Sequence, residues 1–146
     1  MRWIARWTAS CTAGLLIMWM ALAVQPAAAQ TQDALLRFEE NVKWAAVSSD
    51  WVGQRNGWIA AVQSARSPAE VAAQLLELEE AMGWPSVEDA WRGRRDGWVA
   101  EMQAARTNGA VARGLLELES ATKWSAVEPR WRGLRDGWVA SLKSVR

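Results

Sequence analysis

The sequence predicts an all-α protein made of three tandem helix–turn–helix repeats, each 40 residues long. Three observations lead to this prediction: a gapless internal repeat, apolar residues at helical spacing, and capping residues and prolines where helices should begin or end. The three copies start at Leu35, Leu75 and Leu115. Nine tryptophans occupy equivalent positions in them: Trp44, Trp84 and Trp124; Trp51, Trp91 and Trp131; and Trp58, Trp98 and Trp138. Such rare residues do not align by chance, so the repeat is secure.

The first helix of each repeat is clearest in the second copy. Ser67, Pro68 and Glu70 form the pattern of a capping box, with Ser67 as the N-cap and Pro68 at the first helical position. Apolar residues then recur at spacings of four, three and four: Val71, Leu75, Leu78 and Met82. Gly83 and Pro85 predict the end of this helix.

The second helix is expected from near Ser86 to about Arg106. The larger side chains share one side of it: Val87, Trp91, Arg95, Trp98, Met102 and Ala105. The opposite side is small, and a pair of glycines four residues apart recurs there: Gly53 and Gly57, Gly93 and Gly97, and Gly133 and Gly137. Because each glycine costs about 1 kcal/mol of helix propensity, we expect these pairs to let a neighbouring helix pack closely. Six helices and no strand result, arranged as a short solenoid or a compact six-helix bundle.

Most of the tryptophans are expected in the core. A tryptophan buries about 150–250 Å² of surface, and nine exposed indoles would form a large apolar patch. The tryptophans at the hairpin turns are the candidates for an exposed binding surface: Trp44, Trp84 and Trp124.

Glutamate and arginine recur on otherwise apolar helix faces. A buried charge without a partner is costly, so we expect an ion pair within each hairpin, flanked by tryptophan rings. The expected pairs are Glu39–Arg55, Glu79–Arg95 and Glu119–Arg135. The alternative is that both side chains of each pair extend to solvent.

Residues 1–29 have the pattern of a secretory signal peptide. Arg2 and Arg6 precede an apolar stretch of 14 residues, Pro26 follows, and an alanine run ends at Ala29. The alternative is an uncleaved membrane anchor, but a span needs about 20 apolar residues. We therefore expect a periplasmic or secreted protein without a membrane span after cleavage. Its single helical domain would cover residues 30–146, with units at about 30–66, 67–106 and 107–146.

The remaining composition argues against catalysis and nucleic-acid binding. After cleavage the chain keeps 15 basic and 16 acidic side chains, a formal charge of −1, whereas nucleic-acid binders carry a basic surface. It would contain no histidine and no cysteine, and adjacent carboxylates such as Glu79 and Glu80 point about 100° apart on a helix. We expect no enzyme, and no catalytic, cofactor-binding or metal-ligating residues.

Repeated helical hairpins usually build surfaces that bind proteins or peptides. The sequence therefore predicts an exported, non-enzymatic protein–protein interaction or scaffold module of the bacterial envelope. The alternative is a carbohydrate or cell-wall binding module that uses exposed tryptophans. A third possibility is a protein that masks a partner's surface. The partner protein is not identified by any motif.

Overall fold

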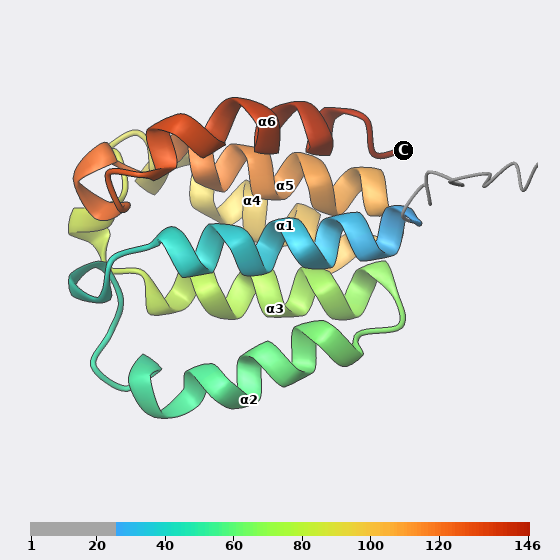
Figure 1. The fold of residues 1–146 in the computed structure, drawn as a ribbon, viewed down its shortest axis with the longest axis horizontal. Coiled ribbons are helices and arrows are strands. Elements are labelled where there is room, and N and C mark those ends of the chain that lie inside the picture. The colour runs from blue at the N-terminus through green and yellow to red at the C-terminus, as the bar shows by residue number, and fades with distance from the viewer. Residues whose placement is uncertain (1–25) are drawn as a thin grey trace, which may run out of the picture.

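The computed structural model describes residues 26–146, and these residues form an all-helical protein. Six α-helices and three short 3-10 turns follow one another along the chain (Figure 1). Their bounds are α1 Ala27–Asn41, η1 Trp44–Ala46, α2 Trp51–Ser64, α3 Pro68–Ala81, η2 Trp84–Ser86, α4 Trp91–Ala104, α5 Asn108–Ala121, η3 Trp124–Ala126 and α6 Trp131–Lys143. The predicted fold class, three helical hairpins in an all-α chain, is confirmed.

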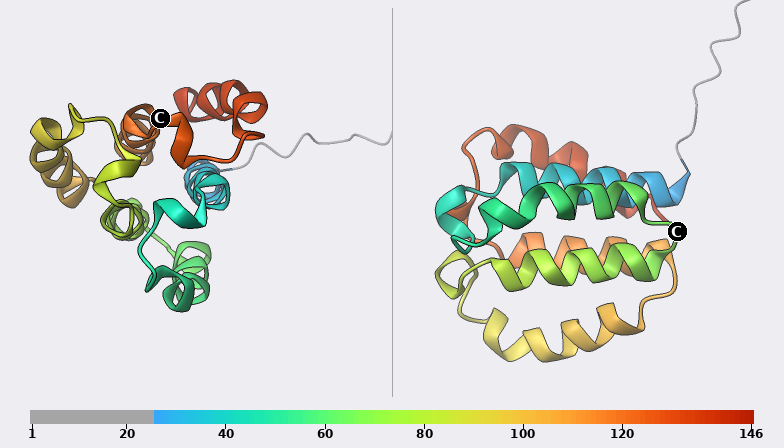
Figure 2. Two further views of the ribbon diagram at one scale, coloured as in Figure 1. Left: turned by 90° about the vertical axis from the view of Figure 1, so that its left-hand side faces the viewer. Right: turned by 90° about the horizontal axis from the view of Figure 1, so that it is seen from below.

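The six helices form a closed bundle with three inner and three outer helices (Figure 2). The inner helices α1, α3 and α5 pack against one another. Each outer helix contacts two inner ones: α2 contacts α1 and α3, α4 contacts α3 and α5, and α6 contacts α5 and α1. The contact of α6 with α1 joins the last helix to the first. Of the two predicted arrangements, the structure therefore has the compact bundle and not the open solenoid.

The segments between inner and outer helices, residues 42–50, 82–90 and 122–130, are here called the connectors. Backbone hydrogen bonds join each connector to the next connector and to the last residue of the inner helix before it: Gly83 N–H donates to Ala46 O (3.0 Å), and Ser48 N–H donates to O of Ala81, the last residue of α3 (2.7 Å). Equivalent pairs link the second connector to the third and the third to the first: Glu88 N to Ala121 O, Lys123 N to Ser86 O, Glu128 N to Asn41 O and Lys43 N to Ala126 O. The three connectors thus form a hydrogen-bonded ring at one end of the bundle.

The connectors correct the predicted start of the outer helices. α4 begins at Trp91 and not near Ser86. The chain before it makes the η2 turn and then an extended residue, Val87, which forms an isolated β-bridge with Thr122. Trp84 therefore lies on a connector, away from the inward side of α4. The capping box of α3 is present, with Glu70 N–H donating to the Ser67 hydroxyl at 3.2 Å.

The core is built from the leucine sides of the inner helices and six tryptophans of the outer helices. Trp91 and Trp98 are 1% and 2% exposed, and their rings meet edge to face with centroids 5.2 Å apart. The second tryptophan of each outer helix also donates its indole N–H to a backbone oxygen of the next inner helix: Trp58 to Gln74 O, Trp98 to Gly114 O and Trp138 to Ala34 O. These bonds tie each hairpin to its neighbour, the third hairpin to the first included.

The predicted close packing at the glycine pairs is wrong for contacts within residues 26–146. The residues concerned are Gly53, Gly57, Gly93, Gly97, Gly133 and Gly137. All six are exposed, and a Cβ atom placed on any of them would meet nothing within 4 Å in residues 26–146 beyond its own helix. The reason is the closed arrangement: each outer helix turns its tryptophan side toward two inner helices, and no further helix of the described chain covers its opposite side.

Gly97→Ala is therefore expected to raise the free energy of unfolding by about 0.5–1 kcal/mol, because alanine has the higher helix propensity and meets no atom there. Urea unfolding followed by circular dichroism measures the change. Gly114→Ala is the matched control, since its methyl group would collide with the buried Met102 side chain and should lower stability relative to Gly97→Ala. A loss of stability at Gly97 would show that this face is covered after all.

Residues 1–25 of the predicted leader lie outside the part of the chain that the structure describes. The cleavage after Ala29 stays a prediction. The helix α1 begins at Ala27, so this cut would remove its first three residues. A contact just beyond the cut joins α1 to the end of α2, because the Gln32 amide donates to Ala65 O at 2.6 Å. Among the helices of residues 26–146, none is both long enough and apolar enough to cross a membrane.

Candidate binding surface at the connector tryptophans

Each hairpin contains the ion pair that its sequence predicts. In the second hairpin, Arg95 Nε and Nη2 donate to the two oxygens of Glu79 at 2.7 and 2.8 Å. The Trp91 indole N–H donates to Glu79 Oε1 at 3.1 Å. The glutamate side chain is 6% exposed and the arginine 31%, so the pair is half-buried and the predicted alternative of two solvated side chains does not occur.

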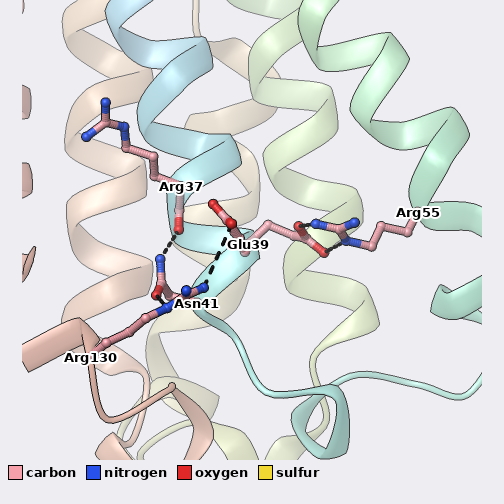
Figure 3. Close-up of polar contacts among 6 residues, drawn as sticks. Arg37, Glu39, Asn41, Arg55 and Arg130 are labelled. Carbon is pink, nitrogen blue, oxygen red and sulfur yellow. Dashed lines mark hydrogen bonds and ion pairs between the residues drawn. The ribbon is translucent and has the colours of Figure 1, made fainter.

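The first hairpin repeats this arrangement, and the third has the same pair through a single hydrogen bond. Arg55 binds both oxygens of Glu39 (Figure 3), and Arg135 Nε donates to Glu119 Oε1 at 2.6 Å. Hydrogen bonding to Glu79 raises the pKa of Arg95 above its ordinary value, against the opposing effect of burial. Each arginine therefore stays charged, and the pair joins the end of an inner helix to the start of an outer one.

The three connector tryptophans are the large aromatic side chains that the fold leaves half exposed. Trp44 is 57% exposed, Trp84 46% and Trp124 48%, whereas the six tryptophans of the outer helices are at most 6% exposed. The structure places all three on equivalent connectors, and so near the same end of the bundle.

Arginines lie over these exposed rings. The Arg92 guanidinium carbon is 4.9 Å from the Trp84 ring centroid, and that of Arg132 is 5.0 Å from Trp124. In the first hairpin, the position equivalent to Arg92 and Arg132 is occupied by Val52, whose side chain is 64% exposed. The ion-pair arginine Arg55 lies 5.7 Å from the Trp44 ring there. The first site is consequently more apolar at its surface than the other two.

A small hollow accompanies each connector tryptophan. The hollows beside Trp44, Trp84 and Trp124 have volumes of about 230, 220 and 180 Å³. Each is lined by the glutamate and arginine of the local ion pair and by a connector valine: Val47, Val87 or Val127 in the respective hairpins. The resulting surface combines an indole, an apolar rim and a neutralised ion pair three times.

The junction between α6 and α1, here called the seam, differs from the other two junctions. Arg130 Nε donates to Asn41 Oδ1 at 2.8 Å, and the Asn41 amide donates to Arg37 O at 2.7 Å (Figure 3). Phe38 packs on Trp131 and Trp138 with centroid distances of 5.9 and 5.8 Å. Sequence analysis missed this set. The signal was available as departures from the repeat, since alanine and leucine occupy the positions of Asn41 and Phe38 in the other copies.

The seam also contains a groove of about 760 Å³ between α1 and α6. Leu36, Arg37, Arg130, Leu134 and Gly137 are among the residues that line it. We call it the seam groove. In the part of the chain that the structure describes, no group of three or more cysteine, aspartate or glutamate residues is placed to hold a metal ion.

One family model matches this chain, over residues 26–83, and it is described as a domain of unknown function, DUF8799. The matched stretch contains the first hairpin and the inner helix α3 of the second. No curated protein and no solved structure shows significant similarity to the chain.

Proposed function

We propose that this chain is an exported, non-enzymatic helical-repeat module of the bacterial envelope that binds a partner protein through its connector tryptophans. The observation that carries the proposal is the contrast in burial. Six tryptophans close the core, while Trp44, Trp84 and Trp124 stay half exposed at one end of the bundle. The leader pattern of residues 1–29 supports export.

The composition of the exposed sites favours a protein partner. Tryptophan and arginine are the side chains most enriched at binding hot spots, and here an arginine lies over each exposed indole. Each hollow is small, but the bundle carries three of them near the same end. A partner that binds two or three of these sites at once has a higher overall affinity than each site alone provides, because binding at one site raises the effective concentration at the others.

Replacing Trp44, Trp84 and Trp124 together by alanine should abolish capture of the partner while leaving the fold intact, because these half-exposed side chains are not members of the buried core cluster. The measurement compares proteins retained from envelope extracts by the immobilised chain and by the triple variant. Helix content and the unfolding midpoint of the variant verify its fold.

The matched control replaces three exposed residues at equivalent positions near the far ends of the outer helices, Gln63, Gln103 and Lys143. This variant should retain the partner. Equal capture by the tryptophan variant and the wild type would place the binding surface elsewhere and refute the proposal.

A carbohydrate ligand is the second candidate, and one observation favours it. Each exposed indole stands beside a carboxylate–guanidinium pair in a hollow of about 180–230 Å³, which offers a stacking surface together with donors and acceptors. Soluble cell-wall glycans that change tryptophan emission of the wild type and not of the triple variant would favour this candidate over a protein partner.

A further inference from the structure

We propose that a second copy of this chain docks along the seam groove, so that the protein forms a two-fold symmetric dimer through α6 and α1. The groove runs beside α6 from Arg130 to Ser141, a distance of about 16 Å or three helical turns. This surface is separate from the connector tryptophans and goes beyond the function proposed above.

The seam differs from the α4–α5 junction in the side chains that face one another across it. Between α4 and α5, Arg94 reaches across to Glu117 at 3.4 Å. At the seam, Leu134 and Arg37 occupy the two equivalent positions. Arg37 turns along its own helix to Asp33, at 2.8 Å, and does not cross to α6. Among the described residues, no ion pair joins the positions of Leu134 and Arg37 across the seam, and a hollow of about 760 Å³ lies there.

Leu134 gives the groove an apolar projection at its centre. Its side chain is 51% exposed, where the other outer helices carry Gln54 and Arg94. It stands halfway between Arg130, which binds Asn41, and Trp138, which binds Ala34 O. In a dimer, the exposed leucine of one copy can be buried in the groove of the other copy.

The glycines of α6 make such a close contact sterically possible. A Cβ atom at Gly133 or Gly137 would meet nothing within 4 Å, so the backbone of α6 is open to a neighbouring helix. The other outer helices share the glycines but carry Gln54 and Arg94 at the position of the exposed Leu134. The seam therefore presents a projection and a recess on the same patch, which is what an isologous interface requires.

The charges of the groove complement those of a second copy. One end carries Arg130 and Glu40, 3.8 Å apart, and the other carries Arg37 and Asp33. All four side chains are at least half exposed, and their formal charges cancel. A two-fold axis through Leu134 would bring opposite ends together, so that Arg130 of each copy faces Asp33 of the other copy. This arrangement avoids contact between like charges of the two copies. The balanced charge of the groove also does not require a strongly charged partner.

Sedimentation equilibrium over a concentration series tests the proposal on the protein expressed from its full-length gene. The wild type should dimerise. Leu134→Glu should raise the dissociation constant by about tenfold or more, because it places two carboxylates at the axis and removes an apolar anchor. Gly137→Leu should have the same effect by filling the groove, and its Cβ atom would meet nothing within 4 Å in the described monomer.

Gln54→Glu and Gly57→Leu are the matched controls, because they make equivalent changes on the exposed side of α2. Both should leave the dissociation constant unchanged. A wild type that stays monomeric overturns the proposal, and so does a dimer that the two seam variants do not weaken. Controls that weaken the dimer as much as the seam variants would place the interface elsewhere, and an oligomer larger than a dimer would contradict two-fold closure.

Discussion

Replacing Glu79 by alanine should lower the free energy of unfolding by about 3 kcal/mol, near the lower end of the range for breaking a buried ion pair. Glu79 is 6% exposed and accepts hydrogen bonds from Arg95 and from the Trp91 indole. Its removal leaves a buried N–H without an acceptor and a guanidinium without its counter-charge. The arginine is 31% exposed and can be rehydrated in part, which limits the loss.

A double-mutant cycle separates the pairing from the other effects of the two side chains. Arg95→Ala alone should cost at least as much as Glu79→Ala, because it leaves a carboxylate that is only 6% exposed without its counter-charge. The double variant should be more stable than the sum of the two losses implies, by about 1 kcal/mol or more. Urea unfolding supplies the four stabilities. Glu80→Ala is the control, because Glu80 is exposed one residue further along the same helix and should change little. Additive losses would show that the pair contributes no coupling.

Trp138→Ala should destabilise the protein by about 3–5 kcal/mol and loosen α1, which lies more than 90 residues earlier in the chain. Trp138 is 6% exposed, packs on Phe38 and Trp131, and donates its indole N–H to Ala34 O at 2.9 Å. Because α6 closes the bundle against α1, the loss should appear in both helices. Amide hydrogen exchange of α1 and chemical unfolding of the whole chain measure the two effects.

Two further variants isolate the cause of this loss. Trp138→Phe keeps an aromatic ring but loses the hydrogen bond to Ala34 O, and should cost less than the alanine variant. Trp124→Ala removes a tryptophan that is 48% exposed and should leave exchange in α1 unchanged. Normal protection of α1 in Trp138→Ala would mean that the seam does not hold the first helix.

The sequence alone was sufficient for the repeat, the helical hairpins and the ion pairs. The 40-residue period aligns chemically equivalent residues, and it places a glutamate on the apolar face of one helix and an arginine on the apolar face of the next. The ion pairs then follow from the rule that buried charges are paired. The exposed tryptophans were identifiable for a similar reason. Trp44, Trp84 and Trp124 fall at hairpin turns, where a large side chain has few neighbours to cover it.

Closure of the bundle could not be read from the repeat. Identical hairpins stack in an open array or a closed one according to the angle between neighbours, and that angle depends on packing details that a pattern of apolar residues does not encode. The glycine pairs misled for a related reason. Gly93 and Gly97 form a thin helix side whether or not another helix lies on it, and only the position of the neighbouring hairpins shows that this side faces solvent.

The hydrogen-bonded closure of three connectors fixes the copy number of the repeat. In an open array a unit can be gained or lost at little cost, because the terminal units act as caps and the interior interfaces repeat. Here the three hairpins together close the bundle, and the side of α1 that packs on α6 is apolar and would be exposed to water without α6. Deleting or duplicating 40 residues would separate these two surfaces and expose buried indoles. Gain or loss of a single repeat would therefore disrupt this architecture, whereas substitutions can distinguish one hairpin from another, as at Asn41, Arg130 and Leu134.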